Sequence, residues 1–153
     1  MELNGVPLHP LIVHAVVVLG PLAALTGLAY AAVPRWRWLL RWPLVVLAVV
    51  TAVAAVLAAQ AGESLLESRP QLAPLVEEHE ELGELLRTVS LGYAVFAALA
   101  AWALGGVSAL ASGRGARETR FGIPVAVLLA AASVGLMVVI YLAGDSGAQA
   151  VWG

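Results

Sequence analysis

The sequence contains no cysteine and no lysine, and only 12% of its 153 residues are charged. Without cysteine the chain cannot form disulfides, ligate an iron–sulfur cluster or use thiol catalysis. The net charge is only −2, and no basic patch is interleaved with aromatic residues, so nucleic acid is not an expected partner. An ordinary soluble domain has roughly a quarter of its residues charged. Because 61% of this chain is hydrophobic instead, the composition is not that of an ordinary soluble domain.

Four long stretches carry no charged side chain, and they cover residues 3–34, 42–62, 88–113 and 121–144. Each reaches or exceeds the roughly 20 residues that a helix needs to cross a hydrocarbon core about 30 Å thick. The sequence therefore predicts one integral membrane domain over residues 1–153. Its fold class is all-α, a four-helix transmembrane bundle. The expected spans are residues 11–33, 42–61, 88–111 and 122–142.

The few charges are divided between the two ends of these spans. Six of the eight arginines lie in the loops after the first and the third span, at positions 35, 37, 41, 114, 117 and 120. Nine of the ten acidic residues lie at the opposite end. By the positive-inside rule the arginine loops face the cytoplasm, and both termini lie outside. We expect a multi-pass protein of the bacterial inner membrane, with the lipid bilayer as its surroundings.

The connection between the second and third spans predicts a third helix that extends outside the membrane. A glycine and two prolines break the start of the connection, at positions 62, 70 and 74. From Leu72 to Phe96, apolar residues and His79 then recur at alternating spacings of three and four, which is a single helical stripe. The third helix is predicted to begin near residue 72. Gly144 and Gly147 are interpreted as the turn that ends the fourth helix.

Five residues could carry chemistry, and all five belong to the predicted outer side: His9, His14, Glu63, His79 and Asp145. If each span takes about 20 residues from its cytoplasmic end, three of these residues lie near one plane, namely His14, Glu63 and Asp145. Pro10 suits the first position of the first helix, which would leave His9 extended and free to fold over the bundle. His79 is predicted to lie about 18 Å above that plane, so a tilted or bent helix would be needed to lower it.

Two segments of the chain stand out, Pro7-Leu8-His9-Pro10-Leu11-Ile12-Val13-His14 and His79-Glu80 followed by Gly83. They resemble the opening and a second segment of one bacterial membrane family, the uncharacterised domain of unknown function 2231. A third segment is Gly144-Asp145-Ser146-Gly147-Ala148, where many members carry Gly-His-x-Gly-Gly. The chain departs from the family in having Ala15-Val16 for Phe-Pro and Asp145 for the last histidine. The resemblance implies four transmembrane helices.

The leading functional hypothesis is an electron-transfer module that binds haem b near the extracytoplasmic face. His14 and His79 would be the axial ligands, with His9 as the alternative ligand, because imidazoles on facing helices can coordinate one iron from opposite sides. Chains related to the family are joined to Rieske or c-type cytochrome modules. The resemblance therefore implies a Rieske or cytochrome c type redox partner, and quinone is another candidate partner.

Two other functions are consistent with the same residues. A zinc or copper ion could be held by four of them, His9, His14, Glu63 and Asp145, since mixed imidazole and carboxylate ligands suit zinc. Alternatively, the chain could be a purely structural subunit of a membrane complex or a homo-oligomer. Small residues recur at every fourth position in all four spans, for example Ala23 and Gly27 in the first and Ala131 and Gly135 in the fourth, and such faces allow helices to pack in a bilayer.

Overall fold

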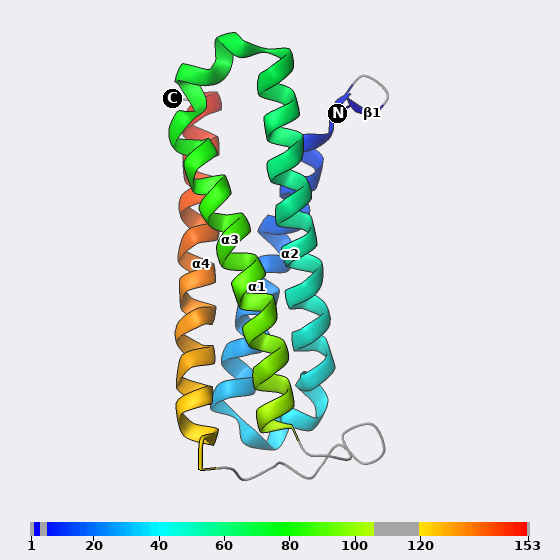
Figure 1. The fold of residues 1–153 in the computed structure, drawn as a ribbon, viewed down its shortest axis with the longest axis vertical. Coiled ribbons are helices and arrows are strands. Elements are labelled where there is room, and N and C mark those ends of the chain that lie inside the picture. The colour runs from blue at the N-terminus through cyan, green and yellow to red at the C-terminus, as the bar shows by residue number, and fades with distance from the viewer. Residues whose placement is uncertain (1, 4–5, 106–119, 153) are drawn as a thin grey trace.

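The computed structural model describes residues 2–3, 6–105 and 120–152, and it shows four long helices packed side by side (Figure 1). Two short strands pair antiparallel before the first helix, and two turns of 3-10 helix join later elements. In chain order the elements are β1 (Glu2–Leu3), β2 (Val6–Pro7), α1 (Leu8–Ala32), η1 (Pro34–Trp36), α2 (Arg37–Ser68), η2 (Pro70–Leu72), α3 (Ala73–Leu104) and α4 (Gly122–Trp152).

All four helices are long and apolar enough to span a membrane, which confirms the predicted all-α transmembrane bundle. Helix α3 begins at Ala73, next to the predicted start, and runs for 32 residues. A helix of that length measures about 48 Å at 1.5 Å per residue, whereas the hydrocarbon core is about 30 Å thick. The third helix therefore extends outside the membrane, as expected. The end of the predicted third span, residues 106–111, and the arginines at 114 and 117 lie outside the described residues.

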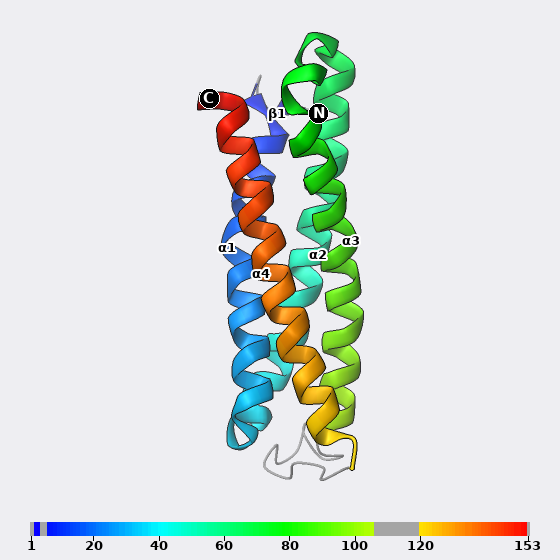
Figure 2. The ribbon, with the colours of Figure 1, turned by 90° about the vertical axis from the view of Figure 1, so that its left-hand side faces the viewer.

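Helices α1, α2, α3 and α4 alternate in direction and form a ring in which each helix packs on two neighbours (Figure 2). The chain order is also the order around the bundle, because α4 returns to pack against α1. Helices α1 and α3 consequently lie on one diagonal of the bundle, and α2 and α4 lie on the other.

Three predicted helix ends are wrong. Helix α2 continues through Gly62 to Ser68, and α4 continues through Gly144 and Gly147 to Trp152. A glycine inside a helix costs only about 1 kcal/mol relative to alanine, so packing against neighbouring helices can outweigh it. Helix α1 begins at Leu8, which places His9 inside its first turn rather than before it. Proline is tolerated at position 10 because the N–H groups of a first helical turn have no partner within the helix.

Small residues let the helices approach closely at the centre of the bundle. A side chain at Gly27 of α1 would overlap the hydroxyl groups of Tyr93 and Ser133, which come from α3 and α4. The Tyr93 hydroxyl donates a hydrogen bond of 2.9 Å to the carbonyl oxygen of Ala23. In α4, however, the predicted small-residue pair Ala131 and Gly135 is exposed. The buried face of α4 instead includes Leu129, Ser133 and Leu136.

At the end opposite the termini, the arginine-rich connection caps a helix. Arg37 donates hydrogen bonds to the carbonyl oxygens of Tyr30 (3.0 Å) and Ala31 (3.3 Å) in the last turn of α1. These carbonyls have no partner within their helix, and a cation at a helix C-terminus also interacts favourably with the helix dipole. Arg41 lies against Gly105, directly after α3. The first turns of α2 thereby join the ends of α1 and α3.

A substitution at Gly27 tests the close contact of α1 with Tyr93 and Ser133. Gly27→Ala should destabilise the bundle by about 1–3 kcal/mol, the usual cost of overpacking a well-filled core. Gly135→Ala is the matched control, because nothing lies within 4 Å of an added side-chain carbon there. It should be neutral, or stabilising by up to about 1 kcal/mol through helix propensity. Unfolding in mixed detergent micelles, followed by circular dichroism, measures both changes, and equal stabilities of the two variants would contradict this packing.

Candidate functional site

Two of the three histidines meet near the end of the bundle that carries the N-terminus and the end of α4. His9 from the first turn of α1 and His79 from α3 are half-buried, and their ring centroids are 5.9 Å apart. The ring planes are at 80°, so the contact is edge to face. Since α1 and α3 lie on a diagonal, this contact joins the two halves of the bundle across its centre. We refer to His9 and His79 as the histidine pair.

The hydrogen bonds of the histidine pair define which ring nitrogen is protonated. His9 Nδ1 lies 2.8 Å from the carbonyl oxygen of Ala58 in α2, and His79 Nδ1 lies 3.1 Å from the carbonyl oxygen of Ala143 in α4. A carbonyl oxygen can only accept, so each Nδ1 must carry the hydrogen and donate it. In the neutral rings, both Nε2 atoms then keep a lone pair. This is the arrangement of a metal-ligating histidine whose other ring nitrogen is held by a backbone carbonyl.

Each histidine of the pair also lies against a glycine one turn beyond its carbonyl partner. A side-chain carbon at Gly62, four residues after Ala58, would come within 3.2 Å of His9 Nδ1. A side-chain carbon at Gly147, four residues after Ala143, would come within 2.9 Å of His79 Cε1. The glycines thus provide the space in which each ring reaches the backbone of the neighbouring helix.

The two halves of the bundle repeat one arrangement. In each half a histidine of the first helix binds a carbonyl of the second helix, with an alanine and a glycine at Ala-x-x-x-Gly spacing. One difference separates them, because Ser146 in α4 occupies the position that Ala61 has in α2. The Ser146 hydroxyl lies 3.2 Å from His79 Nδ1 and donates to the carbonyl oxygen of Ala143 at 3.1 Å. His79 consequently has one more polar partner than His9.

The hydrogen-bond partners of the histidine pair are neutral carbonyl and hydroxyl groups, so burial governs the pKa of His79. His79 belongs to residues 73–87 of α3, which precede the uncharged stretch of that helix. Burial lowers the pKa of the His79 imidazole, and the nearby His9 lowers it as well, while the hydrogen bond with Ala143 raises it. The lowered pKa favours the neutral ring of His79 at pH 7, and with it the lone pair on Nε2.

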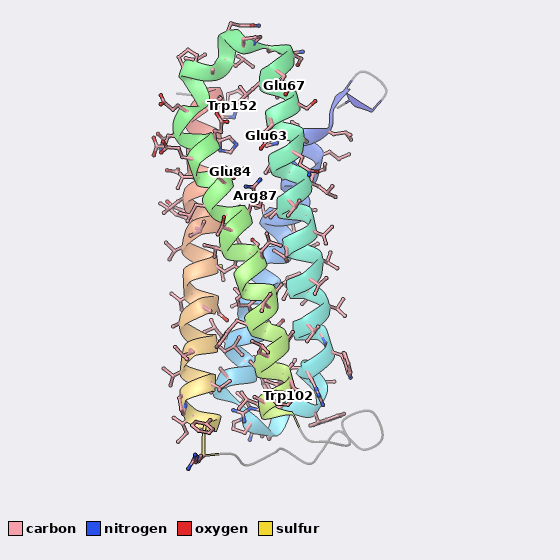
Figure 3. The ribbon with its side chains drawn as sticks, viewed as in Figure 1. Glu63, Glu67, Glu84, Arg87, Trp102 and Trp152 are labelled. Carbon is pink, nitrogen blue, oxygen red and sulfur yellow. The ribbon has the colours of Figure 1, made fainter. Side chains whose placement is uncertain are left out.

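The other three predicted site residues are exposed, unlike the half-buried pair. His14 is exposed, and its Nδ1 contacts the carbonyl oxygen of Pro10 in the same helix. Glu63 is exposed on α2 (Figure 3), and Asp145 is exposed on α4, where it accepts a hydrogen bond of 2.9 Å from Gln149. In the described part of the chain, no group of three or more histidine, aspartate and glutamate residues could hold a metal ion. The set of four residues expected to bind zinc or copper is therefore not gathered in one place.

His79 contacts His9, although the sequence placed it about 18 Å above the plane of His14, Glu63 and Asp145. That height was counted from residue 111 as the cytoplasmic end of the third span, whereas α3 ends at Leu104. Helices α2 and α4 also continue beyond their predicted spans, so Gly62 and Gly147 lie beside the histidine pair. Sequence reasoning missed these partners because it interpreted Gly62 as a helix break and Gly147 as part of a turn. The signal was the repeated Ala-x-x-x-Gly spacing in the C-terminal parts of the second and fourth helices.

The fold and the histidine pair define an integral membrane four-helix bundle with a two-imidazole site near one end. The chain belongs to the family described as "Predicted membrane protein (DUF2231)", whose family model matches residues 5–153. This match confirms the family resemblance of the three sequence segments. A comparison with curated proteins and with solved structures gives no significant match.

The carbonyl contacts predict the tautomers of the histidine pair. In protein labelled with ¹⁵N-histidine, His9 and His79 should both show a protonated Nδ1 and an unprotonated Nε2 at neutral pH. Spectra of His9→Gln and His79→Gln variants would assign the two signals. A protonated Nε2 together with an unprotonated Nδ1 on either ring would contradict the hydrogen bonds to Ala58 and Ala143.

Proposed function

We propose that this membrane protein is a metal-binding module in which His9 and His79 hold one transition-metal ion through their Nε2 atoms. The observation that carries the proposal is the convergence of two imidazoles whose Nδ1 atoms are both committed to backbone carbonyls. Such second contacts orient the ring and raise the basicity of the ligating nitrogen. An imidazole that served only to close a helix end would not require a second imidazole facing it.

The spacing of the rings suits one shared ion. A metal–imidazole bond is about 2.0–2.1 Å long, so two rings on one ion have centroids about 5 to 6 Å apart, depending on the angle at the metal. The observed separation is 5.9 Å. Imidazole suits copper, zinc, iron and nickel, and among the divalent ions Cu²⁺ has the highest affinity in the usual order. Copper is therefore the ion that we expect to bind most strongly, with water or a partner's ligand completing the coordination.

A haem iron between His9 and His79 is the second candidate. It is favoured by the origin of the two imidazoles on opposite helices of the bundle, which is how axial ligands reach one iron in helical bundles. In this version the protein would pass electrons to quinone or to a Rieske or cytochrome c type partner. The close contacts of both rings with α2 and α4 at Gly62 and Gly147 favour a bare ion, because a porphyrin needs space on those sides.

Metal titration of the purified protein tests the site. Wild type should bind one Cu²⁺ per chain, and His9→Ala and His79→Ala should each abolish stoichiometric binding. His14→Ala is the matched control, because His14 is exposed and its Nδ1 contacts Pro10 of its own helix. An absorption spectrum after reduction by dithionite separates the candidates, since a Soret band in protein from haem-supplied cells would identify haem. If wild type binds neither, or if His14→Ala abolishes binding as His79→Ala does, the proposal fails.

Two glycine variants of α4 test the position of the His79 ring without replacing a histidine. Gly147→Ala should displace the His79 ring and weaken copper binding by about 10- to 100-fold, as changes to the partners of metal ligands commonly do. Gly144→Ala introduces the same methyl group one turn earlier, where nothing lies within 4 Å, and should bind like wild type. Equal affinities of the two variants would contradict a role for the His79 ring.

We also propose that the protein lies in the bacterial inner membrane with both termini outside. Support comes from the arginines of η1 and α2 at one end and the carboxylates of α2 and α3 at the other. The chain has no cysteine, so single-cysteine variants report orientation cleanly. In intact spheroplasts, an impermeant maleimide should label Gln71→Cys but not Arg35→Cys, and both should react in opened membranes. Labelling of Arg35→Cys alone in intact spheroplasts would reverse the orientation.

A further inference from the structure

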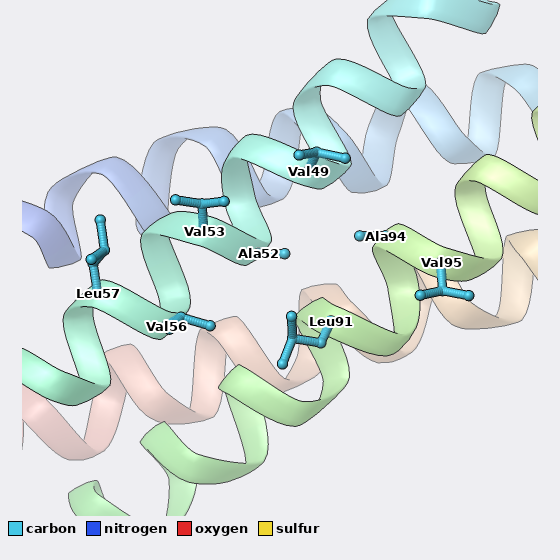
Figure 4. Close-up of a pocket in the computed structure, with 8 residues that line it drawn as sticks. All are labelled: Val49, Ala52, Val53, Val56, Leu57, Leu91, Ala94 and Val95. Carbon is cyan, nitrogen blue, oxygen red and sulfur yellow. The ribbon is translucent and has the colours of Figure 1, made fainter.

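An apolar groove runs between α2 and α3 (Figure 4). Its volume is about 300 Å³, and all its lining residues are apolar: Val49, Ala52, Val53, Val56, Leu57, Leu91, Ala94 and Val95. These residues belong to the uncharged stretches of the two helices. The groove opens outward, since Val53 is 53% exposed and Val95 is 62% exposed on its rim. In a bilayer this face meets lipid rather than water.

The groove has the length of a lipid tail segment. From Val49 to Leu57, α2 rises about 12 Å at 1.5 Å per residue. One leaflet contributes about half of a hydrocarbon core that is about 30 Å thick. Within the predicted second span, residues 42–61, the groove begins near the middle, at Val49, and ends four residues short of the outer end, at Leu57.

An arginine lies one helical turn beyond Leu91, the first groove residue of α3. Arg87 precedes Leu91 by one helical turn, so the two residues share the face of α3 that continues to Val95. Figure 3 shows the Arg87 side chain between α3 and α2. Arg87 forms an ion pair with Glu84, and both side chains are partly exposed, at 35% and 41%. A guanidinium has five N–H donors, so this single ion pair leaves donors for another anion.

Arg87 is one of few basic residues in a part of the chain that is rich in glutamate. Between residues 42 and 113 the sequence has seven glutamates and only two arginines, Arg69 and Arg87. Arg69 lies at the tip of the connection between α2 and α3, whereas Arg87 lies directly before the uncharged stretch of α3. Arg87 is thus the basic residue next to the predicted outer boundary of the third span. On the opposite wall, the exposed Gln60 follows Val56 by one turn and can donate to the same headgroup.

We propose that the groove is a binding site for one anionic phospholipid, whose acyl chain lies between α2 and α3 and whose phosphate binds Arg87. An arginine matches the phosphate group in geometry as well as charge, because it can donate two parallel hydrogen bonds. The combination of an apolar channel with a cation at its outer end selects a ligand that is apolar along its length and negative at its head. This inference does not depend on the proposed metal site.

Native mass spectrometry of the full chain in detergent tests the proposal. Phosphatidylglycerol and phosphatidylcholine with identical acyl chains are the probes. Wild type should retain one phosphatidylglycerol in preference to phosphatidylcholine. Arg87→Gln should reduce that preference about fivefold, the effect of one arginine near an anionic surface. Arg69→Gln removes the same charge from the same side of the membrane but away from the groove, and should keep the preference.

A second substitution tests the acyl chain separately from the headgroup. Val95→Phe should fill the groove and reduce retention of both lipids, whereas Val127→Phe adds the same bulk to an exposed position of α4 and should not. Equal retention of the two lipids by wild type, or an equal loss in Arg69→Gln and Arg87→Gln, would overturn the proposal. So would efficient disulfide crosslinking of Val53→Cys chains in native membranes, which would show a second copy of the protein at the groove.

Discussion

Close approach of helix backbones is the constraint on which the rest of this structure depends. In a bilayer the lipid tails are as apolar as leucine, so burying leucine side chains does little to drive helices together. Small residues let the backbones come close enough for dispersion and interhelical hydrogen bonds to act. At Gly27 the approach is so close that any side chain would overlap Tyr93 and Ser133. The same closeness, repeated at Gly62 and Gly147 nearer the end that carries the N-terminus, allows an imidazole to reach the backbone of a neighbouring helix.

The helix carbonyls that accept these hydrogen bonds have a common feature. Each already accepts an intrahelical bond, and its second lone pair is accessible from outside the helix. Tyr93 uses the carbonyl of Ala23 in this way at the centre of the bundle, and His9 and His79 use those of Ala58 and Ala143 nearer the end. These three side chains are thus satisfied by backbone carbonyls, without buried charge. Consequently the two imidazoles can approach each other while both Nδ1 atoms bind backbone carbonyls.

Much of the fold was predictable from the sequence because membrane helices are marked by length and composition. Four uncharged stretches indicate four helices, and the stripe through Leu72, His79 and Phe96 indicates a third helix that begins outside the membrane. Helix ends were less predictable. Gly62, Gly144 and Gly147 were interpreted as breaks, yet each lies inside a helix. A glycine signals either a break or a close contact, and only the neighbouring helix decides which, because the cost of glycine within a helix is small compared with the packing that it permits.

By itself, the sequence determined how many helices there are, that they can cross a membrane, and that arginines and carboxylates separate to opposite ends. These properties depend on the free energy of transferring each segment into lipid, which is a sum over residues. The meeting of His9 with His79, while His14 faces outward, was decided only by the tertiary structure. Each residue turns a helix by about 100°, so the partner of a side chain depends on the rotation and height of every helix. Those are set by packing at residues such as Gly27, which is distant in sequence from the histidines that the bundle brings together.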